Sequence, residues 1–415
     1  MHLCFVCPEY PPGPHGGIGT VTQLLARGLV QAGHRVRVIG ICSKDCPASD
    51  YEEDHGVRVW RLREPPVRLG WILARHRMWR QIARWCRREM IDVVEVPDWQ
   101  GWAAGWPRLP VPVVARLHGS ASYFAAELGT SLKWTARYLE RASLRRADFW
   151  CSASRYTADK TPLAVRLPSR SATILYNPVE IRSGENDVFR TKNEVVFTGT
   201  LTPKKGIQTL IEAWPRVRDK CPDAELHLYG KDGRTSDGQS MTAFLGQRLE
   251  GRTRASVHFH GHAGRAKILE ALQRASVAVF PSYAEAFALA PMEAMACGCP
   301  TIYSQRTSGP ELIEHGHTGW LVPPDQPPWI ADSITRILKD DRLAAQLGAA
   351  GRQHVQQNFS VDRLVAQNVD FYEQAVTKFN ERLAYVRLSS LTKAGDPRPV
   401  SLERLTCRES QSVAE

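Results

Sequence analysis

Short apolar segments alternate with amphipathic, helix-like segments along most of this chain, and that alternation restricts the fold more than any other feature. Several of the apolar runs are nearly continuous, which is typical of strands buried on both faces of a parallel sheet. In the N-terminal half, we expect strands at residues 2–7, 35–42, 57–62, 91–96, 111–117, 149–152 and 173–176. A helical pattern over residues 21–32, closed by Gly33, follows the first strand. The N-terminal half therefore predicts a parallel sheet covered by helices.

The same alternation starts again after a polar stretch at residues 182–193. Further strands are expected at residues 194–197, 225–229, 257–260, 277–280, 301–303 and 320–322. At 415 residues, the chain also exceeds what one hydrophobic core usually supports. We therefore expect an α/β protein with two Rossmann-like doubly wound domains, residues 1–180 and 194–360, joined by a linker at 181–193. Their facing strand ends would form a binding cleft.

The C-terminal part of the chain predicts helices and then a tail. Helical periodicity continues over residues 331–359, and residues 361–387 predict one more long helix. Beyond that helix the composition becomes polar, with Gly395, Pro397 and Pro399, so we expect a mobile tail at residues 388–415.

The formal net charge of +11 favours anionic partners such as nucleic acid, an acidic membrane surface or a phosphorylated small molecule. We expect no nucleic-acid partner, because the chain has no zinc-finger spacing, RNP-like aromatic run or helix-turn-helix pattern. The ten cysteines are scattered, and no run of about 18 apolar residues could span a bilayer. Because no basic n-region precedes the first apolar run, we expect a cytoplasmic protein.

Residues 71–90 form a basic amphipathic pattern with two interpretations. Six arginines face a single glutamate there, while apolar residues recur at helical spacing. In the first interpretation the apolar stripe packs on the N-terminal sheet and the arginines are merely solvated. In the second, the outer face contacts anionic lipid headgroups, which would place the protein peripherally at the inner membrane face.

A glycine-rich loop at residues 11–19 separates the first expected strand from the first helix. Gly16 and Gly17 would let the backbone approach a ligand closely, and a helix starting near Thr20 would direct unpaired N–H groups toward it. Such a loop suits a phosphate or an acceptor hydroxyl. The alternative is a loop that only needs tight turns, because the segment matches neither the dinucleotide fingerprint nor a Walker A motif.

A second segment, residues 282–300, combines two carboxylates with a short helix that follows a strand. Pro291 suits the first helical position, and Gly298 would end the helix after about two turns. Glu293 would then lie in the first turn, where the helix dipole keeps a carboxylate ionised. Glu285 would lie on the loop before the helix and could bind hydroxyl groups of a ligand. A capping role would explain Glu293 but not Glu285.

The segment Glu285-x7-Glu293-Ala-Met-Ala-x-Gly-x-Pro300 resembles the signature of the retaining GT-B glycosyltransferases of family 4, the group 1 type. Other pieces agree in their order along nearly the whole chain: Gly16-Gly17-Ile18-Gly19, Leu117-His118-Gly119, Tyr176-Asn177-Pro178-Val179-Glu180 and Gly199-x-Leu201-x3-Lys205-Gly206. The resemblance implies a GT-B fold, with the donor bound mainly by the C-terminal half. It also implies that the helix at 361–387 crosses back onto the first domain.

The same resemblance implies roles for individual residues. Glu285, Lys205 and His118 would be catalytic: Glu285 and His118 contact the donor sugar, and Lys205 neutralises the leaving diphosphate. The donor-binding residues would be Gly16, Gly17, Thr200, Phe287, Ala288, Leu289 and Glu293. Among these, Glu293 would bind the ribose hydroxyls, the amides of 287–289 would hold sugar hydroxyls, and Gly16 and Gly17 would approach the diphosphate. Thr200 stands where the family commonly has Arg, and it cannot form a bidentate clamp on phosphate.

The implied activity is retaining transfer of a hexose from a UDP- or GDP-sugar to a hydroxyl of a saccharide or lipid-linked acceptor, in surface polysaccharide or glycolipid assembly. The only co-substrate would be the nucleotide sugar, whose phosphate helps to deprotonate the acceptor. We expect no metal, because no Asp-x-Asp motif and no His/Cys/Asp cluster with metal-ligand spacing occurs. The alternative, prompted by Thr200, is a catalytically weak nucleotide-sugar-binding partner subunit of GT-B fold. An epimerase or phosphorylase of the same fold ranks last.

Overall fold

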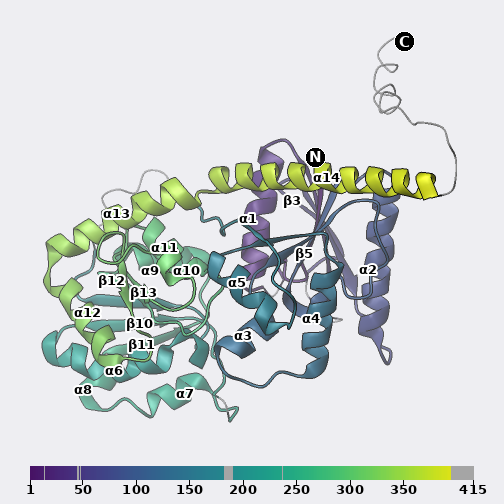
Figure 1. The fold of residues 1–415 in the computed structure, drawn as a ribbon. Coiled ribbons are helices and arrows are strands. Elements are labelled where there is room, and N and C mark those ends of the chain that lie inside the picture. Colours follow the sequence, from purple (N-terminus) through teal and green to yellow (C-terminus); the bar gives the residue numbers. More distant parts are fainter. Residues whose placement is uncertain (14, 44–45, 47, 182–189, 236, 394–415) are drawn as a thin grey trace.

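The computed structural model describes residues 1–13, 15–43, 46, 48–181, 190–235 and 237–393. These residues form two α/β units that lie side by side, each built on its own sheet (Figure 1). Most of the expected linker and residues 394–415 of the expected tail lie outside the described residues. Among the described helices, none is long and apolar enough to cross a membrane.

The N-terminal sheet has eight strands in the order β3-β4-β2-β1-β5-β6-β7-β8. The strands are β1 (His2–Val6), β2 (Arg35–Cys42), β3 (Tyr51–Asp54), β4 (Val57–Arg63), β5 (Val93–Pro97), β6 (Val113–Leu117), β7 (Phe149–Ser152) and β8 (Thr173–Ile174). All neighbours pair in parallel except β3, which runs antiparallel to β4 at the edge. Our sequence prediction contains every strand except β3, because Tyr-Glu-Glu-Asp has no apolar run to reveal it.

The C-terminal sheet has six parallel strands in the order β11-β10-β9-β12-β13-β14. The strands are β9 (Glu194–Thr198), β10 (Glu225–Tyr229), β11 (Val257–Gly261), β12 (Val277–Phe280), β13 (Thr301–Ser304) and β14 (Trp320–Val322). In both sheets the central strands are buried along their whole length because helices cover both faces. The two doubly wound α/β units are as predicted.

Helices of the N-terminal unit cover both faces of its sheet. They are α1 (Gly17–Gln31), α2 (Gly70–Arg87), α3 (Ala121–Glu127), α4 (Trp134–Arg146), α5 (Arg155–Ala164) and the 3-10 turn η1 (Trp99–Gly101). One buried cluster joins the sheet to α1, and another joins it to α2 and α4. The apolar stripe of α2 thus packs on the sheet through Met78, Ile82 and Trp85, as the first interpretation of that segment expects.

The C-terminal unit carries η2 (Pro203–Lys205), α6 (Ile207–Lys220), α7 (Met241–Gly246), α8 (Gly251–Ala255), α9 (Arg265–Arg274), α10 (Leu289–Ala296), α11 (Gly309–Leu312), α12 (Pro327–Lys339) and α13 (Asp341–Phe359). Helices α6, α7 and α12 cover one face of its sheet, and α9, α10 and α13 cover the other. The loops that follow the carboxyl ends of β9 and β12 carry the residues of the predicted site.

The last helix, α14 (Val361–Lys393), starts at the C-terminal unit and runs across the N-terminal one (Figure 1). Val365, Phe371 and Tyr372 are buried in the same cluster as β1 and α1. The helix continues to Lys393, so residues 388–393, predicted as part of a tail, are helical instead.

A buried polar network also fixes α14 to the N-terminal sheet. The Arg116 guanidinium donates to both carboxylate oxygens of Glu95, at 2.7 and 2.9 Å. It also donates to the Asn368 side chain and to the Tyr372 hydroxyl, and that hydroxyl in turn donates to Glu95 at 2.7 Å. A buried arginine with this many acceptors is compensated for its lost hydration. The predicted return of the chain to the first unit is therefore secured by specific hydrogen bonds.

Two helix starts differ from the prediction. Helix α1 begins at Gly17, with Gly16 as its N-cap, so the glycines expected in a loop belong to the first turn. Helix α10 begins at Leu289, which places Pro291 at the third helical position and Glu293 beyond the first turn. Glycine and alanine carry little local information on where a helix starts, and proline is tolerated throughout the first turn.

Candidate active site

The carboxyl edges of the two sheets face each other, and the loop between β12 and α10 bridges them. The Tyr123 hydroxyl donates to the carbonyl of Glu285 at 2.8 Å, and the Asn177 side chain donates to the carbonyl of Phe287 at 2.8 Å. Thr157 donates to the carbonyl of Ala286 at 3.3 Å. All three donors belong to the N-terminal part of the chain, so that part holds the backbone of the predicted donor loop in place.

Lys205 and Glu285 form the charged centre of this region. Their Nζ and Oε1 atoms lie 2.6 Å apart, and the side chain of Glu285 is only 9% exposed. Burial raises the pKa of Glu285, but the positive charges of Lys205 and Lys204 outweigh it and hold the pKa below its usual value. Glu285 is therefore ionised at neutral pH. The structure brings together two of the three residues predicted to be catalytic.

Lys204 supplies a second cation beside this pair. Its ammonium group lies 3.8 Å from the ring centroid of Phe124, across the two units. Burial lowers the pKa of Lys204, and the charge of Glu285 opposes that effect. Two adjacent lysines near one carboxylate leave positive charge available to a phosphate group.

Gly206 explains why the Lys204–Lys205 turn lies where it does. Its φ of +69° is in the left-handed region, and a Cβ there would lie 1.8 Å from the carbonyl oxygen of Pro281. The turn after β9 therefore packs directly against the end of β12. This contact brings Lys205 to the loop that carries Glu285.

Glu293 lies in different surroundings from Glu285. Arg265 of α9 lies 3.4 Å from Glu293 and 3.1 Å from Glu180, so one guanidinium links two carboxylates. Burial raises the pKa of Glu293, with Arg265 opposing, and the net pKa is above its usual value. The sequence pattern predicts Glu293 in the first turn of α10, but it lies beyond that turn, so its charge is compensated by Arg265 and not by the helix N-terminus.

The predicted backbone donors lie at the start of α10. Ala288 is the N-cap and Leu289 is the first helical residue. The first N–H groups of a helix have no acceptor within it. Phe287 packs at a tilt against Tyr176 with 4.8 Å between ring centroids, which fixes the path of the loop before the helix. The structure thus places residues 287–289 where their amides can serve an oxygen-rich ligand.

Gly16 and Gly17 are at the N-terminus of α1, on the N-terminal unit. The amide of Gly16 donates to the Glu9 carboxylate at 3.1 Å, so a side-chain anion already occupies part of this helix end. A Cβ on Gly17 would meet no atom within 4 Å. Among the described residues, no hydrogen bond or ion pair joins these glycines to Lys205 or Glu285.

His118 follows β6 and is a neutral imidazole. Burial and the charge of Arg116 lower its pKa to about 3. It can therefore act as a hydrogen-bonding group but not as a cation at neutral pH. Its backbone N–H donates to Asp98 Oδ1 at 2.9 Å.

Asp98 is the functional candidate that sequence reasoning missed. Its side chain is fully buried after β5, and Oδ2 has no hydrogen-bond partner among the described residues. Burial raises its pKa to about 7. An ionisable residue directly after an apolar strand could have revealed it, because ligands of α/β sheets bind at carboxyl strand ends.

Thr200 is exposed and lies between Gly199 and Leu201 at the end of β9. The amide of the following residue, Leu201, donates to the carbonyl of Lys231. The position therefore offers an exposed hydroxyl where the family commonly has a guanidinium.

Comparisons with known proteins identify both halves of the chain. The model of glycosyl transferases group 1 matches residues 180–354, and that of a glycosyl transferase 4-like domain matches residues 16–178. The chain is 27% identical to the glycogen synthase of Mycobacterium tuberculosis over 94% of this chain and 98% of that protein. It is 26% identical to the GDP-mannose-dependent alpha-(1-6)-phosphatidylinositol monomannoside mannosyltransferase of Mycolicibacterium smegmatis, over 86% of this chain and 94% of that one.

Solved structures agree on the fold. Sucrose-phosphate synthase from Thermosynechococcus elongatus superposes with a TM-score of 0.74 at 22% identity, covering 91% of this chain and 99% of that one. The Anabaena HepE protein, solved with UDP and glucose, superposes with a TM-score of 0.69 at 18% identity, covering 90% and 99%. With both halves matched in order, the chain belongs to the glycosyl transferases group 1 of family 4 and is a nucleotide-sugar-dependent glycosyltransferase of GT-B fold.

Proposed function

We propose that this glycosyltransferase moves a hexose from a UDP- or GDP-sugar, with retention, to a hydroxyl of a saccharide or lipid-linked acceptor in surface polysaccharide or glycolipid assembly. The observation that carries the proposal is the buried Lys205–Glu285 pair, with Lys204 beside it, held against the N-terminal unit. The glycogen synthase and mannosyltransferase relatives support a hexose donor.

The proposed chemistry begins with the leaving group. Breaking the anomeric bond places negative charge on the departing diphosphate, and a fixed ammonium group stabilises that charge in a site shielded from water. When the donor binds, Lys205 exchanges its contact with Glu285 for one with the diphosphate. Glu285 is then able to accept hydrogen bonds from sugar hydroxyls.

The remaining residues position the donor. Glu293, held by Arg265, accepts from the ribose hydroxyls, and the amides of 287–289 donate to the sugar. Neutral His118 contacts the same sugar from the other unit. Gly17 leaves open space beside the end of α1, where the diphosphate can approach the backbone. A donor phosphate oxygen takes the proton from the acceptor hydroxyl.

The test is thermal stabilisation and donor hydrolysis with UDP- and GDP-sugars, without added metal. Wild type is expected to be stabilised by one nucleotide class, and Glu293→Gln is expected to lose most of that stabilisation. Glu212→Gln, an exposed glutamate on α6, is the matched control and should behave as wild type. Stabilisation by neither nucleotide class would overturn the proposal.

Thr200 favours a second candidate, a catalytically weak subunit that binds a nucleotide sugar for a partner. That candidate predicts stabilisation by the nucleotide sugar without hydrolysis or transfer. Hydrolysis that disappears in Glu285→Ala would exclude it.

We also propose a peripheral contact with anionic lipid at the inner membrane face, made by residues 71–90. The face of α2 turned away from the sheet exposes Arg77, Arg80, Arg84 and Arg87. At the N-terminal end of α2, Leu69, Trp71, Ile72 and Leu73 are also exposed, with Leu69 at 58%. Apolar side chains flanked by arginines are typical of an interfacial helix.

Cosedimentation with anionic vesicles at low salt tests this contact. Arg77→Gln/Arg80→Gln is expected to reduce the bound fraction, because each basic residue near an anionic surface contributes about 1 kcal/mol. Arg216→Gln/Arg252→Gln removes the same charge from exposed positions of the C-terminal unit and should leave binding unchanged. Equal binding by the two variants would refute the assignment to α2.

A further inference from the structure

Two histidines and a glutamate lie together at the edge of the C-terminal sheet, away from the candidate active site. Glu225 and His227 alternate along β10, and His258 lies on the edge strand β11, where it pairs directly with His227. Glu225 begins β10, whereas the donor residues follow the opposite, carboxyl ends of β9 and β12. The cluster is therefore separate from the transfer chemistry.

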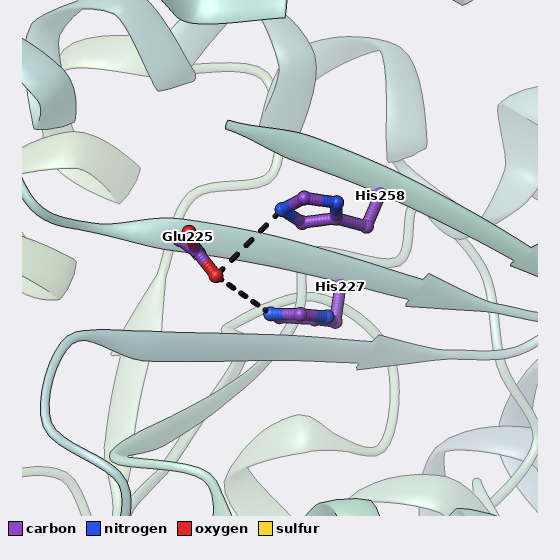
Figure 2. A group of neighbouring side chains, drawn as sticks. All are labelled: Glu225, His227 and His258. Carbon is purple, nitrogen blue, oxygen red and sulfur yellow. Dashed lines mark ion pairs between the residues drawn. The ribbon is translucent and has the colours of Figure 1, made fainter. Parts of the chain in front are cut away.

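The three side chains converge on a small volume. Figure 2 shows the Glu225 carboxylate facing both imidazoles, with Oε2 lying 3.6 Å from His227 Nε2 and 3.7 Å from His258 Nε2. One ligand atom from each residue lies within 4.8 Å of the others. Zinc takes nitrogen and oxygen ligands at about 2.0–2.2 Å, which puts tetrahedral ligands roughly 3.4 Å apart. The two carboxylate–imidazole distances are close to that spacing.

A second observation supports a ligand at this cluster. His258 Nε2 is shielded from solvent and has no hydrogen-bond partner among the described residues. It nevertheless faces a carboxylate oxygen. A buried nitrogen of this kind is normally satisfied, and a metal ion shared with the carboxylate would satisfy it.

The surroundings of His227 also suit a metal ligand. Its Nδ1 lies 3.0 Å from His260 Nε2, and the rings of His260 and Tyr229 stack with centroids 4.2 Å apart. A hydrogen bond at Nδ1 fixes the ring and leaves Nε2 as the coordinating atom. The two residues that flank His227 on β10, Leu226 and Leu228, are buried in the core, so the strand has little freedom to turn the ring away.

We propose that Glu225, His227 and His258 bind one divalent ion of the zinc class, with water completing a tetrahedral shell. The ion cross-links β10 to the edge strand β11. Because it binds the folded sheet and not the unfolded chain, it stabilises this edge in proportion to its affinity and concentration. Edge strands carry unpaired backbone groups, so holding β11 in register also protects the sheet from pairing with another chain.

The test uses the full chain without a polyhistidine tag, after chelator treatment, and titrates Zn²⁺ against a chromophoric chelator. Wild type is expected to bind one Zn²⁺ per chain and to gain thermal stability with it. His258→Ala and Glu225→Gln should each weaken binding at least tenfold and remove most of the thermal shift. His262→Ala, an exposed histidine just after β11, is the matched control and should bind as wild type.

Several outcomes would overturn the proposal. They are failure of wild type to bind Zn²⁺ at micromolar concentration, equal affinity in wild type and Glu225→Gln, or equal losses in His258→Ala and His262→Ala. Glu225 is half-exposed, with 56% of its side chain accessible, so Glu225→Gln keeps the test valid if His258→Ala fails to fold. Donor hydrolysis should not change in Glu225→Gln, which separates this site from the proposed function.

Discussion

Lys205 Nζ lies 2.6 Å from Glu285 Oε1, so the lysine after β9 and the first glutamate of the family signature are direct partners. Eighty residues of sequence separate them. The pairing keeps Glu285 ionised, and under the proposed function the donor diphosphate would compete with Glu285 for Lys205. Lys205 and Glu285, to which the family resemblance assigns separate roles, thus form one ion pair.

Lys205→Ala is expected to lower the turnover number for sugar transfer by about 10²–10³-fold, the usual effect of losing one fixed group that stabilises a developing anion. Steady-state kinetics with the preferred donor measure this effect. Lys192→Ala, which removes an exposed lysine with an 81% accessible side chain, serves as the control. Unchanged turnover in Lys205→Ala would contradict the proposal that Lys205 stabilises the leaving diphosphate.

Gly206→Ala should disturb the same site through the backbone. The substitution places a Cβ 1.8 Å from the Pro281 carbonyl oxygen, so the turn that carries Lys205 must move away from β12. Gly238 has a similar φ of +87° with no atom within 4 Å, so Gly238→Ala isolates the conformational cost, which is about 1 kcal/mol.

Chemical denaturation and donor kinetics distinguish these two variants. We expect Gly206→Ala to lose clearly more stability than Gly238→Ala and to lose turnover as well. Similar losses in both would show that the Pro281 contact is not what positions the lysines.

The raised pKa of Asp98 predicts how the stability of the protein depends on pH. Burial raises its pKa to about 7, above the roughly 3.9 of an unfolded chain, so the folded state holds this proton more tightly. The contribution of Asp98 to the free energy of unfolding is complete below about pH 4. It is lost as the pH rises toward 7, at up to about 1.4 kcal/mol per pH unit.

Asp98→Asn cannot ionise, so its free energy of unfolding should rise relative to wild type between pH 5 and pH 7 and then level off. Denaturation at pH 5, 6, 7 and 8 measures the difference, with exposed Asp223→Asn as the control. A difference that does not vary with pH would contradict a raised pKa for Asp98.

Thr200→Arg should strengthen donor binding about tenfold, because a guanidinium can form two charge-assisted hydrogen bonds to phosphate. Thr200 is exposed, so the longer side chain can be accommodated. Calorimetry with the nucleoside diphosphate of the preferred donor measures the change, and Thr200→Lys, a single point charge, should gain less. No gain in either variant would show that another cation, such as Lys204, already meets that phosphate.

Local sequence patterns are enough to predict the architecture and the presence of the loop between β12 and α10. Apolar runs buried on both faces of a sheet are visible without any tertiary information, and β2, β7, β10, β12 and β14 have the predicted bounds. The helices that begin at Gly17 and Leu289 start two to four residues earlier than the sequence pattern predicts. Glycine, alanine and proline in the first turn carry no amphipathic signal.

Tertiary structure alone decided which charged groups meet and how water is excluded from them. Burial raises the pKa of Glu293 although Arg265 opposes that effect, and its position on the helix does not indicate this. Asp98 titrates near neutrality only because the fold buries it after β5. His227 and His258 become neighbours only through the pairing of β10 with β11. Desolvation and long-range pairing depend on segments far apart in the chain, so no local pattern records them.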